Sequence, residues 1–364
     1  LEDGVQKTAV ARFYGWLRGA FDVVALAFKL RFKRSNAIKQ PKTTRRFMES
    51  LLQDVRYALR NLRVRPLFTA IAILTLGLGI GANTAVFSVV NSILLSGVPM
   101  RAPHELVEVY SSEDNGGYPY SVSSYPDYAE LRERTDLFSG VGAYEGFFAR
   151  METGDNTEAV WGEIVSHNLF SVLGLEPAIG RYFVPEEGQT LGTHPVVVLG
   201  YNFWTQRFGA DTSIVGQTIR LDGISYTVVG IASKKLHSFT ASGFNMDMWI
   251  PYMMAPSLGM GGRAELLTAR NNKSTFMKAR LQPNVTFEQA TAAMATISTQ
   301  FQEAYPEEWE GREFNLVPTE DVAIHPLVDT ALYSVAGLLM TVVGLVLLIA
   351  CTNLAGLLLA RASD

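Results

Sequence analysis

The stretch PLFTAIAILTLGLGIGANTAVFSVVNSILLSGVPM, from Pro66 to Met100, contains thirty-five residues and no charged side chain. About 20 helical residues cross the hydrocarbon core of a bilayer. A longer apolar run can still cross it by tilting. We therefore expect a transmembrane helix at residues 67–96.

Two other interpretations fit this stretch less well. Residues 77–82 match the dinucleotide-binding pattern G-x-G-x-x-G/A, but that pattern needs an acidic residue about 20 positions later, and the first acid here is Glu105. A secretory signal peptide has an apolar region of only about 7–15 residues near the N-terminus. The membrane interpretation therefore explains the stretch best.

Small residues recur every three or four positions along this span, which places them on one face of a helix. Such a face allows a second membrane helix to approach closely. A polar amide facing lipid is costly, so asparagines in the span should face protein. The packing residues predicted for the first span are Gly77, Gly81, Ala85, Ser88, Ser92 and Asn83.

A second uncharged stretch of thirty-one residues runs from Thr330 to Ala360, between Asp329 and Arg361. We expect a second transmembrane helix at residues 330–360. The single cysteine, Cys351, lies inside it, so the region between the spans can form no disulfide. The packing residues predicted for this helix are Gly337, Gly344, Asn353 and Gly356.

Charge is distributed unevenly along the chain. Residues 1–65 contain 15 Lys and Arg against 5 Asp and Glu, whereas the remaining residues contain 16 against 30. Basic residues collect on the cytoplasmic side of membrane proteins. We therefore place the basic N-terminal region, residues 1–50, in the cytoplasm and residues 97–329 outside it. Residues 361–364 would begin a further cytoplasmic segment of a longer protein.

Residues 51–66 show the pattern of an amphipathic helix at a membrane surface. Leucine and valine recur at helical spacing, and a basic face consists of Arg56, Arg60 and Arg63. Residues 9–32 are less clear, because basic residues interrupt an aromatic and aliphatic segment. That segment is either another interfacial helix or a poorly packed remnant of a longer region.

The region between the spans alternates strand and helix patterns. The clearest signals are Asp222-Gly223, which is typical of a β-hairpin, and the capping box from Thr286 to Gln289, which predicts a helix at residues 286–304. Further strands are expected at 105–110, 158–164, 195–199, 275–281 and 313–317, and helices at 126–135, 166–173 and 201–208. The predicted fold is α+β: a mixed sheet with helices on one side, flanked by two transmembrane helices.

Three stretches resemble the permeases of the MacB/FtsX type that carry a MacB-like periplasmic core domain. They are residues 51–95, VSHNLFSVLGLEPAIGRYFVPEE at 165–187, and HPVVVLGYNFWTQRFGADTSIVGQTIRLDGISYTVVGIA at 194–232. The resemblance implies a multi-pass subunit of an ABC-type exporter or mechanotransmission complex in the bacterial inner membrane. It further implies a cytoplasmic ABC ATPase as partner, membrane lipid around the spans and a second permease unit. Family permeases have at least four spans, so this chain matches only their N-terminal part.

The sequence contains no catalytic signature. It lacks the G-x-x-x-x-G-K-[ST] loop of ATPases and the G-x-S-x-G nucleophile motif, and its five histidines are scattered. We expect no catalytic residues, cofactor, metal or nucleic-acid partner on this chain. Trp161, Trp204 and Trp249 could line a ligand groove, although core packing is the commoner role of such residues.

Three functions remain open at this point. The first is a permease subunit that couples cytoplasmic ATP hydrolysis to movement of a periplasmic domain. The second is a membrane-anchored extracytoplasmic binding or scaffold module without transport. The third, an enzyme outside the cytoplasm, has no group of residues to support it.

Overall fold

The computed structural model describes residues 60, 63–64, 66–90, 100–113, 118–153, 156–239, 245–258 and 263–362. The chain divides into two units between Thr75 and Leu76, and every described strand belongs to the second unit. The predictions for residues 1–50, for Arg56 and for Ser92 lie outside the described residues.

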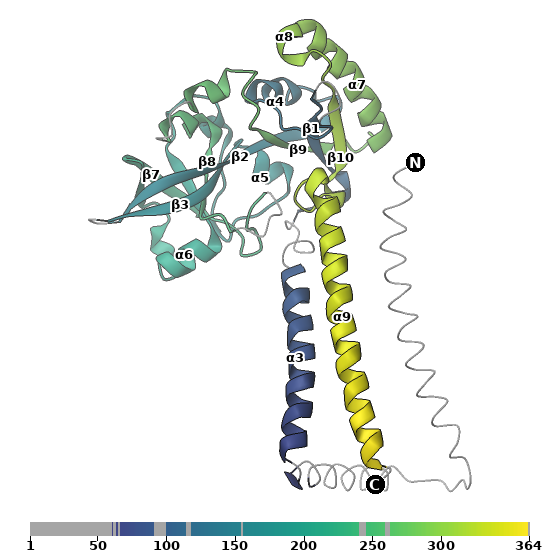
Figure 1. The fold of residues 1–364 in the computed structure, drawn as a ribbon. Coiled ribbons are helices and arrows are strands. Elements are labelled where there is room, and N and C mark those ends of the chain that lie inside the picture. Colours follow the sequence, from purple (N-terminus) through teal and green to yellow (C-terminus); the bar gives the residue numbers. More distant parts are fainter. Residues whose placement is uncertain are drawn as a thin grey trace, which may run out of the picture. The chain divides into compact units, whose positions relative to one another are not determined.

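The described strands of the second unit form one mixed sheet (Figure 1). Its order is β10-β1-β9-β2-β3-β8-β5-β7-β4, and β6 pairs with β2 and β7. The β3–β8 and β5–β7 pairs are parallel, and the other pairs are antiparallel. The strands are β1 (Leu106–Ser111), β2 (Phe138–Thr153), β3 (Asn156–Val165), β4 (Ile179–Gly180), β5 (Val196–Leu199), β6 (Thr218–Leu221), β7 (Ile224–Ile231), β8 (Met248–Pro251), β9 (Phe276–Leu281) and β10 (Phe314–Pro318).

Two hydrophobic clusters cover the two faces of this sheet. Because side chains alternate along a strand, Val141 and Ala143 of β2 join the cluster that contains α4 and α7, whereas Tyr144 joins the cluster that contains α5. Figure 1 shows α5 on the opposite side of the sheet from α4 and α7. The helices are α4 (Tyr125–Leu131), α5 (Leu169–Val172), α6 (Tyr201–Arg207), α7 (Phe287–Ala304) and α8 (Pro306–Trp309), with short 3-10 turns η2 (Pro103–Glu105), η4 (Pro185–Gly188), η5 (Thr212–Ile214), η6 (Tyr252–Ser257), η7 (Arg263–Leu267) and η8 (Thr319–Asp321).

The mixed α/β fold is confirmed, but the placement of helices on one side was wrong. The helix expected at 166–173 is only the four-residue α5, and it buries Leu169 and Phe170 against the second face. The helix expected at 126–135 ends at Leu131. Leu173, which follows α5, is also buried, so the apolar pattern of that segment extends beyond the helix.

The two strongest local signals are confirmed. Asp222 and Gly223 have positive φ angles of 46° and 86°, the backbone conformation of a two-residue hairpin turn between β6 and β7. At α7, the Thr286 hydroxyl accepts a hydrogen bond from Gln289 N, and the Gln289 side chain accepts one from Thr286 N. These motifs act through neighbouring residues only, so the sequence is sufficient to predict them.

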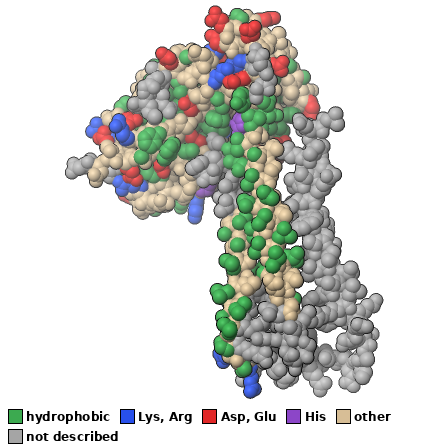
Figure 2. Space-filling view, viewed as in Figure 1, with side chains coloured by type: hydrophobic (Ala, Val, Ile, Leu, Met, Phe, Trp, Pro, Cys, Tyr) green, Lys and Arg blue, Asp and Glu red, His purple; other side chains and the backbone are tan. Residues whose placement is uncertain are grey.

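Two long apolar helices flank the sheet domain in the sequence, α3 (Pro66–Val90) and α9 (Pro326–Ala362). Both helices are long and apolar enough to cross a membrane, with mean hydropathies of 1.8 and 2.6. Only 6% of the apolar segment of each helix is buried inside the protein. Figure 2 shows hydrophobic side chains over these helices, whereas charged side chains gather on the sheet domain. Threonine hydroxyl groups in these helices donate hydrogen bonds to carbonyl groups one turn earlier. The Thr84 hydroxyl donates to the Ile80 carbonyl, and the Thr341 hydroxyl donates to the Gly337 carbonyl.

Candidate functional site

The start of α9 is capped by a buried carboxylate. Asp329, only 2% exposed, accepts hydrogen bonds from the backbone N–H groups of Ala323 at 2.8 Å, Ile324 at 2.9 Å and His325 at 3.2 Å. These groups precede the first turn of the helix, and a negative charge is favourable there because the helix dipole is positive at its N-terminus. We call Asp329 and residues 323–325 the α9 cap.

The α9 cap contacts strand β1 directly. The His325 ring meets the Tyr110 ring edge-on, with centroids 5.2 Å apart. Burial raises the pKa of Tyr110, and Glu108 and Asp329 raise it further, so its hydroxyl stays protonated. The chain reaches this cap through η8 directly from β10, which pairs with β1. A displacement of α9 therefore has a short path to two neighbouring strands.

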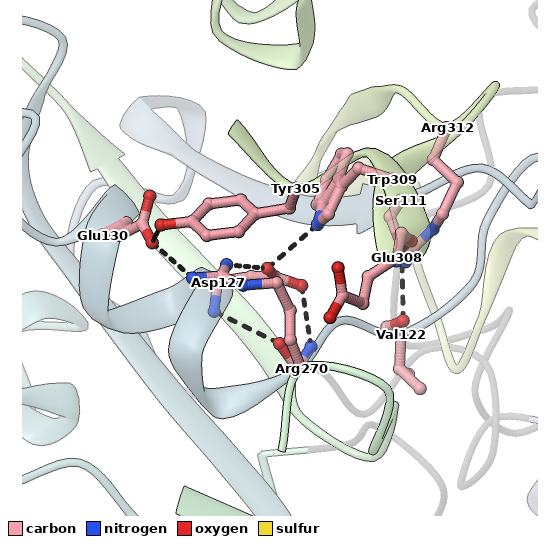
Figure 3. Close-up of polar contacts among 10 residues, drawn as sticks. Ser111, Val122, Asp127, Glu130, Arg270, Tyr305, Glu308, Trp309 and Arg312 are labelled. Atoms are coloured by element: carbon pink, nitrogen blue, oxygen red, sulfur yellow. Dashed lines mark hydrogen bonds and ion pairs between the residues drawn. The ribbon is translucent and has the colours of Figure 1, made fainter. Parts of the chain in front are cut away.

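A second feature, the polar cluster, fixes α8 and the end of α7 to α4 (Figure 3). Its centre is Asp127, whose carboxylate accepts from Arg270 Nη1 at 2.5 Å and from Trp309 Nε1 at 3.1 Å. Arg270 also donates to Glu130, which accepts a bond from the Tyr305 hydroxyl at 2.5 Å. The polar cluster comprises Asp127, Glu130, Arg270, Tyr305 and Trp309.

The electrostatics of the polar cluster favour a charged arginine. Burial alone would lower the pKa of Arg270, but Asp127 and Glu130 outweigh burial and raise it. The guanidinium carbon lies 3.6 Å from the centroid of the Tyr305 ring, so the ring faces the cation. The hydrogen bond to Glu130 raises the pKa of Tyr305 and keeps its hydroxyl a donor.

Arg312 extends this arrangement to β1. It is 3% exposed and donates to the Ser111 hydroxyl at 2.6 Å and to the Glu308 carbonyl at 3.1 Å. Its guanidinium carbon lies 4.6 Å from the centroid of the Trp309 ring. Burial lowers the pKa of Arg312 despite the fields of Asp127 and Glu113. Arg312 thus connects the end of α8 to the end of β1, and its acceptors among the described residues are neutral.

Comparison with known proteins places the chain in a family. The model of the MacB-like periplasmic core domain matches residues 69–297, which is more than half of the chain. The chain belongs to this family. The match begins in α3 and ends inside α7, so α8, β10 and α9 lie outside the matched residues.

Relatives of this MacB-like chain include two proteins named macrolide export ATP-binding/permease protein MacB. The one from Hahella chejuensis is 32% identical over 97 residues, which cover 27% of this chain and 14% of that protein. The one from Burkholderia thailandensis is 29% identical over 99 residues, covering 27% and 15%. The chain thus matches only about 15% of the length of these relatives.

Two solved structures are also similar to the chain. The periplasmic region of MacB from Actinobacillus actinomycetemcomitans has a TM-score of 0.44 and 14% identity, covering 60% of this chain and 90% of that one. The extracellular domain of the noncanonic ABC-type transporter YknZ from Gram-positive bacteria has a TM-score of 0.40 and 13% identity, covering 58% and 99%.

The predicted packing glycines of this MacB-like chain lie in open space in the structure. A Cβ added at Gly77, Gly81, Gly337, Gly344 or Gly356 would have no heavy atom within 4 Å. Ala85, Ser88 and Asn353 are exposed and Asn83 is half-buried. The buried glycine is instead Gly79, where a Cβ would lie 3.2 Å from Leu347 of the same unit. Gly79 lies about 200° around the helix from Gly77 and Gly81, so the packing role of the predicted face stays a prediction.

The predicted basic residues and tryptophans lie in different environments. Arg60 and Arg63 are helical and exposed, and their role at a membrane surface stays a prediction. Trp204 and Trp249 are buried in the hydrophobic clusters, whereas Trp161 is 60% exposed against Phe148. Within the described part of the chain, no group of three or more His, Cys, Asp or Glu side chains could hold a metal ion.

Sequence analysis missed both the α9 cap and the polar cluster. One signal for the cluster was present, because Ser124-Tyr-Pro-Asp127 has the spacing of a capping box, and the structure contains that box. No signal connects Asp127 with Arg270, which is 143 residues away. Asp329 was noted only as a charge that bounds an apolar stretch.

Proposed function

We propose that this chain is the part of an ABC-type exporter permease in which the second membrane helix passes movement to the periplasmic domain. The observation that supports it most directly is that α9 runs without a break from the α9 cap to Ala362. A continuous helix with a buried cap transmits displacement better than a helix joined through a flexible linker. Residues 330–360 cross the membrane and residues 319–329 meet β1 and β10.

In this proposal α3 also spans the membrane, the N-terminus is cytoplasmic and residues 97–329 are extracytoplasmic. A cytoplasmic ABC ATPase, on a separate chain or in another domain, supplies the energy. A second permease unit completes the machine, and lipid surrounds both helices. The exposed apolar surface of α3 and α9 and the family membership support this topology, since a water-exposed apolar surface of that length would be costly.

The first test is recovery of the full-length protein from mild detergent, followed by a search for a P-loop ATPase bound to it. Co-purification of an ATPase in stoichiometric amount supports the proposal. Recovery of the permease alone from several detergents would overturn it in favour of the membrane-anchored binding module, because that module shares the topology but needs no ATPase.

The second test asks whether the α9 cap couples the two parts. In Asp329→Asn the charge that holds three N–H groups is lost, and hydrogen bonds to charged groups contribute on the order of 1.5–3 kcal/mol. We expect ATP hydrolysis to stay within about twofold, whereas the ATP-dependent change in hydrogen exchange at β10 falls about tenfold. Asp321→Asn, an exposed acid in η8, is the control. An unchanged response in Asp329→Asn would contradict coupling through the cap.

A further inference from the structure

An open cavity of about 530 Å³ lies in the sheet domain, apart from the α9 cap and the polar cluster. Its lining comes from four places: α4 and the residue that follows it, the segment before α5, η4 and η6. Sites for small molecules have volumes of roughly 300–1,000 Å³ and combine apolar walls with a few polar groups. The cavity has the size of such a site.

The lining of this cavity carries one positive charge, and the carboxylates of Glu186 and Glu187 lie near enough to act on its His167 ring. Among the described residues that line it, Arg132 alone carries a charge at neutral pH. The His167 ring stays neutral there because burial and the nearby Arg132 lower its pKa by more than Glu186 and Glu187 raise it. Arg132 is oriented by the Tyr128 ring, whose centroid lies 5.7 Å from the guanidinium carbon.

Arg132 is available to an incoming anion. Its ion pair, with Glu133 at 3.3 Å, is exposed, and the Glu133 side chain is 73% accessible. Exposed ion pairs contribute little to stability, so a ligand can replace Glu133 at low cost. An arginine is well suited to this role because its planar fork of N–H donors matches a carboxylate or a phosphate.

The remaining wall suits an apolar group. Tyr125 packs its ring against Tyr252, with centroids 4.9 Å apart, and Pro185 and Met253 complete the apolar lining. Burial raises the pKa of Tyr125 to about 12, so its hydroxyl is a donor at neutral pH. The cavity therefore presents one cation and neutral donors beside an apolar wall.

We propose that this cavity binds a small amphiphilic anion, in which a carboxylate or a phosphate monoester pairs with Arg132 and a short apolar chain lies against Tyr125, Pro185 and Met253. This inference does not depend on the proposed function. It would hold equally for a tethered binding module, since it concerns only the sheet domain.

The test uses the full chain in nanodiscs of zwitterionic lipid, with hexyl phosphate and hexanoate as probes in separate titrations followed by saturation-transfer NMR. Empty nanodiscs correct for partition into lipid. We expect saturable binding of at least one probe and weaker binding of uncharged 1-hexanol. In Arg132→Gln the affinity should fall on the order of tenfold, because the charge-assisted pair is lost.

Three further variants test whether the probe binds beside Arg132. Glu133→Gln should bind the probe more tightly, since it removes the competing carboxylate. In Gly188→Ala binding should fall, because the new methyl group would collide with the His167 ring. Arg134→Gln is the matched control: Arg134 is half-buried like Arg132, bonds to Gln300 at 2.7 Å and does not line the cavity. Circular dichroism checks that each variant is folded.

The outcomes separate clearly. Loss of binding in Arg132→Gln with retention in Arg134→Gln supports the proposal. Equal binding by wild type and Arg132→Gln overturns it, as does a failure of both anionic probes to bind the wild type. Binding of 1-hexanol as tight as that of hexyl phosphate would show an apolar pocket without anion selectivity and would also overturn it.

Discussion

Asp127 illustrates how a single residue can organise distant parts of this chain. Its side chain caps α4 through the Ser124 N–H and also holds Arg270 and Trp309, and it is fully buried. A buried carboxylate is tolerated only when it is paired, because desolvating an unpaired charge is costly. If the carboxylate were removed, the Ser124 N–H and the Trp309 Nε1–H would lose this acceptor, and Arg270 would keep its bond to Glu130.

We predict that Asp127→Ala lowers the free energy of unfolding of the sheet domain by about 3–5 kcal/mol, the usual cost of breaking a buried ion pair. Denaturant unfolding of the full chain in detergent, followed by tryptophan fluorescence, would measure it. Glu158→Gln, which removes the exposed pair with Arg207, should change the same quantity by less than about 1 kcal/mol. A similar loss in both variants would mean that burial of the cluster does not matter.

Strand β2 shows why an element can be central in the fold and still escape sequence analysis. It pairs with β3, β6 and β9, yet the segment FSGVGAYEGFFARMET contains three glycines, which usually count against a strand. Two of them have a packing reason. A Cβ at Gly140 would press on Val172, and one at Gly142 would press on Leu169, so their absence of a side chain lets α5 lie on the sheet.

Two glycines of β2 allow a matched test of the contact between β2 and α5. At Gly142 a Cβ would lie 2.5 Å from Leu169 Cδ1 and 2.9 Å from Leu169 Cα, whereas at Gly146 no heavy atom lies within 4 Å. Gly142→Ala should lower the unfolding free energy by about 1–3 kcal/mol through overpacking. Gly146→Ala should be neutral or stabilise by up to about 1 kcal/mol. Thermal unfolding by circular dichroism compares them, and an equal effect would rule out the contact with α5 as the cause.

In the whole molecule, the last elements of the chain are consecutive and are attached to the sheet domain at several points. The segments α7, α8, β10, η8 and α9 follow one another in the chain, and the polar cluster, Arg312 and the α9 cap attach them to α4 and β1. In the proposed function, a displacement of α9 passes to the edge of the sheet and, through α8, to the polar cluster.

The proposed topology predicts which residues reagents outside the cell can reach. In a Cys351→Ser background, Ser225→Cys, an exposed position in β7, should react with a membrane-impermeant maleimide added to intact spheroplasts. Ser50→Cys should react only after the membrane is made permeable, because the proposed topology places the basic N-terminal region in the cytoplasm. The opposite labelling pattern would invert the topology and contradict the proposal.

Sequence by itself was sufficient for features that depend on composition or on near neighbours: two apolar helices, the hairpin at Asp222-Gly223, the capped start of α7 and the family resemblance. Features that depend on distant residues were decided only by the tertiary structure. Arg270 meets Asp127, His325 meets Tyr110, and α5 covers the second face of the sheet. The physical reason is that local motifs satisfy their own hydrogen bonds and periodicity, whereas a buried ion pair or a glycine contact exists only after the sheet has brought distant segments together.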